Sequence, residues 1–405
     1  MDALDILADL DHVSPHFQPI FNAEEHKIIG YEILGRYRKG NEVFSLGPFF
    51  KDEQIPEEFR MEVDQAVLDK ALEKAAQLND QELLWFVNRD LELLMLDNGE
   101  QFIQHILRYK ERGLQPEQIV LEISEWKSET ENGSFEHLIQ YFKSYGIKLA
   151  VDTAGNASNQ AEQIVRLSPE ILKIDMSFMR TNSTGTAYLD ILHSMSILAR
   201  KIGATLLFER IETPFQLQFA WKNGGRYYQG FYLHKPGEVF LDKNILKERF
   251  KKECHGFILS EKKRLQSFFD LKQELNTFIS DIVGKIKKQQ DENEFLMALA
   301  KPLEEMAFRM YICDEDGFQK SANIFKEKED WILQPEYEEK NWSWRPYFLE
   351  NIIRMRVGKK GIISDRYSDI ETGEMIRTFS LPLSDDRYLF VDLCSSYLYK
   401  KEGLF

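Results

Sequence analysis

The chain has 405 residues, of which 43% are hydrophobic and 29% are charged, and its formal net charge is −15. This length predicts two or three domains, and the hydrophobic fraction excludes a largely disordered protein. The acidic balance argues against binding to a nucleic-acid polymer, although local arginines, lysines and metal ions could still hold a small anion.

The sequence carries no feature of a secreted or membrane-spanning protein. Its three cysteines, Cys254, Cys313 and Cys394, show no CxxC spacing, which favours a reducing compartment and argues against a zinc site. The amino terminus is acidic and lacks a basic start followed by an apolar run, so we expect no signal peptide. No apolar stretch reaches the roughly 18 residues that suggest a membrane span. We therefore expect a cytoplasmic protein without membrane insertion.

Residues 16–240 alternate between short β-rich runs and helical stretches, which include residues 57–77 and 186–202. The β-rich runs are almost continuously apolar, as expected for strands covered on both faces. They comprise residues 83–87, 119–123, 148–151, 171–174 and 205–208. Repeated strand–helix units of this kind predict a parallel sheet, either open or closed into a barrel.

Polar or charged residues stand at the end of each of these runs. They are Asn88, Glu122, Asp152, Lys173 and Glu209. Parallel barrels and open α/β sheets place their chemistry at the carboxyl ends of the strands. A series of such residues therefore favours a functional site at that end of the sheet.

Together with Glu32, several of these side chains could form a metal site. The oxygen donors are Glu32, Asn88, Glu122, Asp152 and Glu209, and the set contains no Cys or His. Hard oxygen ligands select Mg²⁺, Mn²⁺ or Ca²⁺ over zinc, and such ions typically act beside phosphates. The alternative, for any single carboxylate, is a solvated loop residue.

Apolar residues recur every three or four positions through residues 245–290, which predicts one long amphipathic helix. This helix could pack on its own barrel, or it could be a signalling or dimerisation helix. Residues 291–405 begin with a helix from Glu294 to Met306 and then become β-rich, which predicts an α+β domain with an antiparallel sheet. The expected division is therefore 1–244, 245–290 and 291–405.

A series of segments in the first region resembles the motifs of the EAL-domain family, in the family's order. Tyr31–Arg36 resembles the Glu-Ala-Leu-x-Arg signature, with Ile33 in place of Ala. The other matching segments are His16–Ile20, Phe86–Asn88, Leu121–Glu125, Leu172–Asp175, Glu209–Thr213 with Gln216, and Gln229–Tyr232 with Lys235–Pro236. The resemblance covers residues 16–237 and implies a TIM-like (β/α)8 barrel with one antiparallel strand, which binds cyclic di-GMP.

The resemblance also implies a role for individual residues. Glu32, Asn88, Glu122 and Asp152 would hold one divalent metal, Mg²⁺ or Mn²⁺, whereas Ca²⁺ would bind without supporting turnover. The residues implied in catalysis are Lys173, Glu209 and Gln229, with Glu209 also helping a second metal. Those implied in ligand contact are Gln18, Arg36 and Asp175, although Gln18 and Arg36 could instead be ordinary surface residues. Glu125 would brace the metal-bearing loop, as carboxylates behind metal ligands do.

One loop departs from the family pattern. Active members read Asp-Asp-Phe-Gly-Thr-Gly where this chain reads Asp-Thr-Ala-Gly-Asn-Ala at residues 152–157. Thr153 offers a neutral hydroxyl in place of the carboxylate that ligates the second metal, so the clamp on the attacking water is lost. We therefore favour a cyclic-di-GMP receptor with weak or absent phosphodiesterase activity. The alternatives are an active phosphodiesterase that produces pGpG and a scaffold that binds no nucleotide.

The C-terminal region resembles PAS-like or CACHE-type sensor domains. The resemblance rests on the segments Asn341–Phe348, Ser364–Asp369 and Thr372–Glu374. It implies that an Arg, aromatic residues and an Asp line a cavity for a small ligand, but Trp342, Trp344 and Tyr347 could equally be core. The expected partners are cyclic di-GMP, a second copy of the chain in a homodimer, and an unknown small ligand or protein at this domain.

Overall fold

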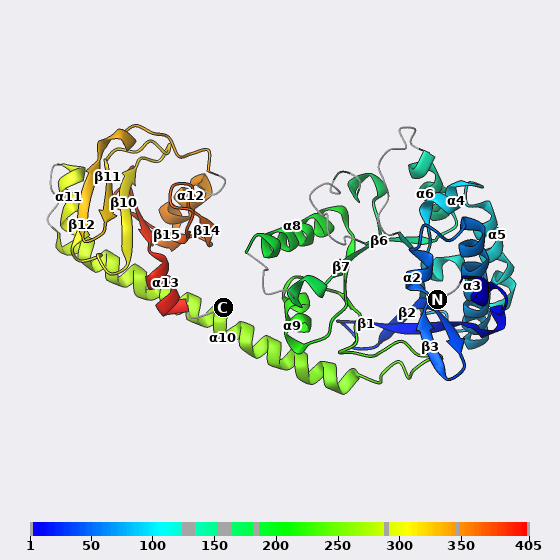
Figure 1. Ribbon diagram of the computed structural model, residues 1–405. Helices are drawn as coiled ribbons and strands as arrows, with labels where there is room; N and C mark the ends of the chain where they lie inside the picture. Colours follow the sequence, from blue (N-terminus) through cyan, green and yellow to red (C-terminus); the bar gives the residue numbers. More distant parts are fainter. Residues whose placement is uncertain are drawn as a thin grey trace. The chain divides into compact units, whose positions relative to one another are not determined.

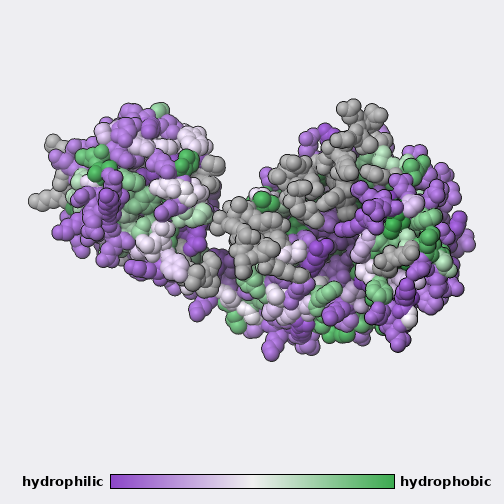
Figure 2. All heavy atoms as spheres, viewed as in Figure 1, coloured by the Kyte–Doolittle hydropathy of each residue, from purple (hydrophilic) through white to green (hydrophobic). Residues whose placement is uncertain are grey.

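The computed structural model describes residues 3–123, 134–152, 162, 164–180, 186–286, 291–345 and 348–402. The chain divides into two compact units, Met1–His255 and Gly256–Phe405. Each unit contains one sheet with helices packed around it (Figure 1). In both units the surface drawn in Figure 2 is predominantly hydrophilic, with apolar residues scattered among polar ones.

The first unit is a closed barrel with one extra strand. Its strands are β1 (Val13–Asn22), β2 (Ile28–Lys39), β3 (Glu42–Ser45), β4 (Leu84–Asn88), β5 (Ile119–Ile123), β6 (Lys148–Asp152), β7 (Ile171–Asp175), β8 (Thr205–Glu209) and β9 (Tyr227–Tyr228). The order is β1-β9-β8-β7-β6-β5-β4-β2-β3, and the ring closes because β1 also pairs with β2. β1 runs antiparallel to both β2 and β9, and the other neighbours around the ring are parallel. The expected barrel with one antiparallel strand is confirmed.

The helices of this unit cover the outside of the strands. They are α1 (Ala3–Leu7), α2 (Gly47–Phe50), α3 (Glu57–Leu78), α4 (Leu91–Met95), α5 (Glu100–Arg108), α6 (Ser134–Ser144), α8 (Thr186–Ile202) and α9 (Pro214–Lys222). α3 buries an apolar stripe that includes Val63, Val67 and Ala71, at the spacing that one face of a helix requires. Because helices lie outside and side chains fill the inside, β5 is buried at every position, as its continuous apolar run predicted.

The second unit is an α+β domain with an antiparallel sheet. Its elements are α11 (Glu292–Ala300), β10 (Ala307–Cys313), β11 (Asn323–Glu327), β12 (Asp330–Gln334), α12 (Phe348–Gly358), β13 (Ile362–Ile363), β14 (Tyr367–Ser368), β15 (Met375–Pro382), β16 (Tyr388–Leu393) and α13 (Ser395–Glu402). The sheet order is β12-β11-β10-β16-β15-β13, with β14 on β15. The helix expected from Glu294 to Met306 ends earlier, at Ala300, because Pro302 has no backbone N–H to continue the helical hydrogen bonds.

The two faces of this sheet bury different residues. Met310 and Ile312 of β10 pack in a cluster with Leu275 and Ile279 of the long helix α10 (Lys247–Lys285). Tyr311, which lies between them in sequence, faces the other way into a second cluster that contains residues of α12. The alternation follows from the two-residue period of a strand.

The long helix expected over residues 245–290 is α10 (Lys247–Lys285). In its first turns Phe250 is buried, with its ring 5.6 Å from that of Phe21 in the barrel. Farther along, Leu259 and Phe269 are exposed. The predicted use of this helix in a homodimer stays a prediction. Among the described residues, no helix combines the length and the apolar character needed to cross a membrane.

A buried ion pair ties α3 to the end of β4. Arg89 follows Asn88, and its guanidinium pairs with Asp64 and lies 5.3 Å from the ring of Phe102. Burial lowers the pKa of Arg89 to about 10. The guanidinium is therefore held charged in the interior by one carboxylate, close to the end of a strand that carries a candidate site residue.

We predict that Asp64→Ala lowers the free energy of unfolding by about 3–5 kcal/mol, because it leaves the buried charge of Arg89 without its partner. Denaturant unfolding of the full chain, followed by circular dichroism, measures the change. The matched control is Glu162→Ala, which removes an exposed i,i+4 pair with Arg166 and should change stability by less than about 0.5 kcal/mol. Equal effects of the two substitutions would contradict the assignment.

Candidate functional site

The interior of the barrel contains an apolar layer with a polar layer above it. The apolar cluster comprises Ile20, Phe86, Val120, Ala150, Ile171 and Leu207. Two residues further along each parallel strand stand Asn88, Glu122, Asp152, Lys173 and Glu209. Side chains two residues apart on a strand point to the same face, so these groups lie on the inner face at the carboxyl end. The strand-end residues singled out in the sequence therefore lie together at this end of the barrel.

Lys173 lies at the centre of the polar layer. Its ammonium nitrogen is 2.8 Å from a carboxylate oxygen of Glu122, 2.9 Å from one of Glu209 and 3.8 Å from one of Glu32. Lys173 is 3% exposed and Glu122 is 2% exposed. β2, β5, β7 and β8 therefore each contribute a charged side chain to one nearly dry cluster.

Glu32 is also held by two amides. Asn88 donates a hydrogen bond of 2.9 Å to one of its oxygens, and Gln229 donates to the other. The amide nitrogens of Asn88 and Gln229 thereby face a carboxylate, which fixes the orientation of both groups. Glu32, Asn88, Glu122, Lys173, Glu209 and Gln229 are thus brought together, and Asp152 stands beside Lys173 in the strand register.

The cluster contains more negative than positive groups. Burial, with the charge of Glu32 added, raises the pKa of Glu122 well above its usual value. For Lys173, burial favours the neutral form, but the surrounding carboxylates outweigh it and raise the pKa well above the usual value. Burial also raises the pKa of Glu209, and the charge of Asp152 adds to the effect. Lys173 therefore stays charged but does not compensate all of the carboxylates.

Two oxygen atoms in this cluster are buried without a hydrogen-bond partner: Oε1 of Glu122 and Oε1 of Gln229. Within the described residues, no group of three or more His, Cys, Asp or Glu side chains meets as a ready metal cluster. The donor set therefore depends on amide as well as carboxylate oxygens. Its excess negative charge and unpartnered oxygens fit a hard divalent cation.

Gln18 and Arg36 flank this cluster. Gln18 pairs with Glu32 in the register of β1 and β2, and its side chain is 8% exposed. The guanidinium of Arg36 donates to the carbonyl oxygen of Gly35 at 2.9 Å and to the hydroxyl of Ser45 at 3.4 Å. No carboxylate of the described residues lies within ion-pair distance of Arg36, so its charge is available to an anionic ligand.

Asp175, expected to contact ligand, already has two partners. One carboxylate oxygen accepts a hydrogen bond of 2.7 Å from the backbone of Ser177, and the other lies 3.0 Å from the guanidinium of Arg210. Sequence reasoning missed Arg210 as a site residue. The signal was present, because Arg210 stands where the family motif has Gly, and its φ of 55° is in the left-handed region that Gly favours.

Gln216 and Gly230 position the loops around the site. The Gln216 side chain donates 2.9 Å to the carbonyl of Met176 and accepts from the backbone of Glu212 at 2.7 Å, so it joins the loops after β7 and β8. Gly230 follows Gln229, and a Cβ there would overlap the backbone of Ile211. Glu125 and Thr153 lie outside the described residues.

We predict that Gly230→Ala destabilises the barrel by about 1–3 kcal/mol, since the added methyl group must push the backbone of Ile211 away and displace Gln229. Thermal and denaturant unfolding measure the loss. Gly237→Ala is the control, because a Cβ at that position meets nothing within 4 Å. A Gly230→Ala chain as stable as the Gly237→Ala chain would refute the close approach.

Comparison with known proteins matches both parts of the chain to described families. Residues 2–236 match the family described as EAL domain, and residues 240–405 match the EAL-domain associated signalling protein domain. The chain is 48% identical to the EAL-domain protein YkuI of Bacillus subtilis, with 100% of both chains covered. The crystal structure of YkuI in complex with substrate c-di-GMP and calcium superposes with a TM-score of 0.94.

More distant relatives match the barrel region. The cyclic di-GMP phosphodiesterase PdeA of Borreliella burgdorferi is 28% identical over 52% of this chain and 30% of that protein. The structure of the PaMucR phosphodiesterase, 20% identical, covers 59% of this chain and 98% of that chain with a TM-score of 0.52, and it supports the fold alone.

Proposed function

The chain belongs to the EAL-domain family, and we propose that its barrel binds cyclic di-GMP but hydrolyses it weakly or not at all. The family resemblance of the sequence motifs is confirmed by the match over residues 2–236. The observation that carries the binding proposal is the buried carboxylate and amide cluster with an uncompensated Arg36 beside it. The full-length similarity to YkuI, whose structure holds cyclic di-GMP and calcium, supports the same ligand.

A divalent cation would complete the polar layer. Glu32, Asn88, Glu122 and Asp152 would hold it, and the unpartnered oxygen of Glu122 is the feature that supports this assignment best. When bound, such an ion neutralises phosphate charge and lowers the pKa of a coordinated water. We propose Mg²⁺ or Mn²⁺ as the ion in the working protein. Calcium, present in the YkuI structure, is a candidate for binding without turnover.

The anionic phosphates of the nucleotide need cationic partners outside the metal site. The guanidinium of Arg36 has a planar set of donors that suits phosphate, and Gln18 adds an amide. Asp175 is held by Ser177 and Arg210, which fix its orientation, and its contact with the ligand stays a proposal.

The proposal of weak hydrolysis rests on the sequence at Thr153. A neutral hydroxyl replaces a carboxylate there, so a second cation would be held less firmly and the attacking water would keep a higher pKa. The alternative, an active phosphodiesterase, is supported by the placement of Lys173 between Glu122 and Glu209, with Gln229 close to Glu32. The two proposals differ in turnover and agree on binding.

The two units of the chain also suggest an organisation for the full protein. We propose a barrel over residues 1–244, a connecting helix over 245–290 and a PAS-like or CACHE-like sensory domain over 291–405, assembled as a homodimer. Exposed apolar residues on α10, including Leu259 and Phe269, support a partner for that helix.

We predict that Arg36→Ala weakens cyclic di-GMP binding about tenfold or more, because a charge-assisted contact is worth about 1.5–3 kcal/mol. Isothermal titration in Ca²⁺ measures the affinity, and the same titration in EDTA tests the metal requirement. Arg226→Ala is the control, since Arg226 precedes β9 at the amino end and pairs with Glu24. Equal affinities for the Arg36 variant and the parent would remove Arg36 from the site.

We predict that the parent releases little pGpG in saturating Mg²⁺ or Mn²⁺, and that Thr153→Asp combined with Ala154→Phe increases the rate clearly. The added carboxylate strengthens the second cation site, and the Phe restores the loop residue of active members. Thr153→Asn is the control, because it adds a side chain without charge. A parent with full activity would replace the receptor proposal with the phosphodiesterase one.

A further inference from the structure

The second unit contains a cavity of about 220 Å³ between the sheet and the segment that leads into α12. The sheet contributes Tyr311 of β10, Phe390 of β16 and Thr378 of β15. Arg345, from the segment that leads into α12, and Phe348, the first residue of α12, also line it. The cavity belongs wholly to residues 311–390, so it is independent of the barrel site and of the function proposed for it.

One wall of the cavity is a stack of aromatic rings. The ring of Phe390 lies 5.2 Å from that of Tyr311, with an interplanar angle of 6°, and 5.4 Å from that of Phe348, with an angle of 18°. Nearly parallel rings present flat apolar surfaces. A ligand with a flat or narrow apolar body would bury that surface against this wall.

Arg345 supplies the uncompensated charge of the cavity. Its guanidinium lies 4.4 Å from the ring of Trp342, a cation–π contact. Within the described residues, the Arg345 side chain makes no hydrogen bond and no ion pair. A partly buried guanidinium without an anion is a group that an anionic ligand would satisfy.

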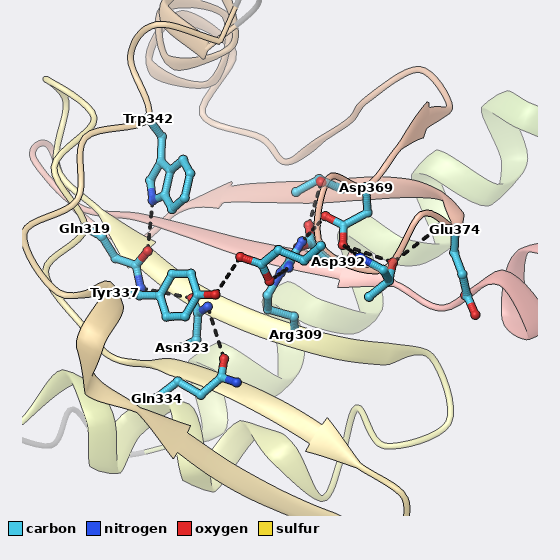
Figure 3. Close-up of polar contacts among 12 residues, drawn as sticks. Arg309, Gln319, Asn323, Gln334, Tyr337, Trp342, Asp369, Glu374 and Asp392 are labelled. Atoms are coloured by element: carbon cyan, nitrogen blue, oxygen red, sulfur yellow. Dashed lines mark hydrogen bonds and ion pairs between the residues drawn. The ribbon is translucent and has the colours of Figure 1, made fainter.

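The carboxylate that lines the cavity, Asp369, is already neutralised. One oxygen accepts a hydrogen bond of 2.6 Å from Arg309, and the other accepts from the backbone and hydroxyl of Thr372, each at 3.0 Å. Figure 3 shows Arg309 between Asp369 and Asp392. Asp392 accepts from Arg309 and from Thr378, both at 2.6 Å. These groups have their partners without a ligand.

Tyr311 adds an unpartnered donor. The side chain is 6% exposed, lines the cavity, and its hydroxyl makes no hydrogen bond within the described residues. Burial raises the pKa of Tyr311 well above its usual value, so the hydroxyl stays protonated. The cavity thus presents one cationic group and one neutral donor that both lack an acceptor.

We propose that this cavity binds a small organic carboxylate with a flat apolar body. The carboxylate accepts from the guanidinium of Arg345 and from the hydroxyl of Tyr311, and the body packs against Phe348 and Phe390. The cavity volume of about 220 Å³ suits a small molecule. The second unit is then the ligand-sensing part of the protein, with a ligand class set by Arg345.

Three small aromatic probes of similar shape test which ligand charge the cavity prefers. Benzoate, benzamide and benzylamine carry an anionic, a neutral and a cationic group on the same ring. Isothermal titration or ligand-observed NMR on the full chain should show benzoate binding about tenfold or more tightly than either analogue, the gain expected of a charge-assisted pair. Absence of benzoate binding at millimolar concentration, equal binding of benzamide, or tighter binding of benzylamine would each overturn the proposal.

Two substitutions assign the contacts. Arg345→Gln should remove the preference for benzoate over benzamide, and Tyr311→Phe should weaken benzoate binding several-fold. Arg354→Gln is the matched control, because Arg354 is an exposed residue of α12 that pairs with Glu350 at 2.6 Å. A preference unchanged in Arg345→Gln would overturn the proposal. Thermal unfolding checks each variant, and the comparison of probes on the parent chain needs no variant at all.

Discussion

The buried ammonium group of Lys173 holds the barrel site together. It lies within 4 Å of carboxylates from β2, β5 and β8, next to the apolar layer of the barrel interior. Carboxylates in a low-dielectric interior repel one another strongly, so the cluster is tolerable only with cations inside it. Lys173 supplies one positive charge, and the remaining negative charge makes the site a receptor for further cations. The metal affinity that we propose thus follows from the charges in the polar layer of the barrel.

The sequence predicted the barrel well because its signals are local. An apolar run that ends in a polar residue, such as Asn88, Glu122 or Lys173, predicts a strand. It also predicts that the polar side chain lies at the carboxyl end of that strand. The sequence signalled an unusual residue at Arg210, but it did not show that Arg210 pairs with Asp175, because that contact depends on β7 and β8 lying side by side. In the second unit, β11 and β12 escaped prediction because their residues are largely half-exposed and give weak alternation.

In the second unit, alternate residues of the central strands face opposite sides of the sheet, and the two sides have different roles. Ile312 and Val391 face the apolar cluster that includes α10, whereas Tyr311 and Phe390 face the cavity. β10 and β16 therefore present the wall of the cavity on one face of the sheet and the surface that packs against α10 on the other face. Arg309 binds Asp392 of β16 and Asp369 of the loop before β15, so the polar side of the cavity is anchored to the same strands.

The antiparallel first strand also affects how the chain is made. Phe21 of β1 pairs with Tyr228 of β9, so the ring joins residues separated by most of the first unit. Long-range pairings of this kind form late, because the chain between them must be ordered first. During synthesis from the amino terminus, β1 and β2 can pair at once as a hairpin. The other edge of β1 remains without its neighbour until the ribosome has passed residue 228. The nascent protein therefore presents an open sheet edge for much of its translation, and this is the interval in which a chaperone would have a strand to protect.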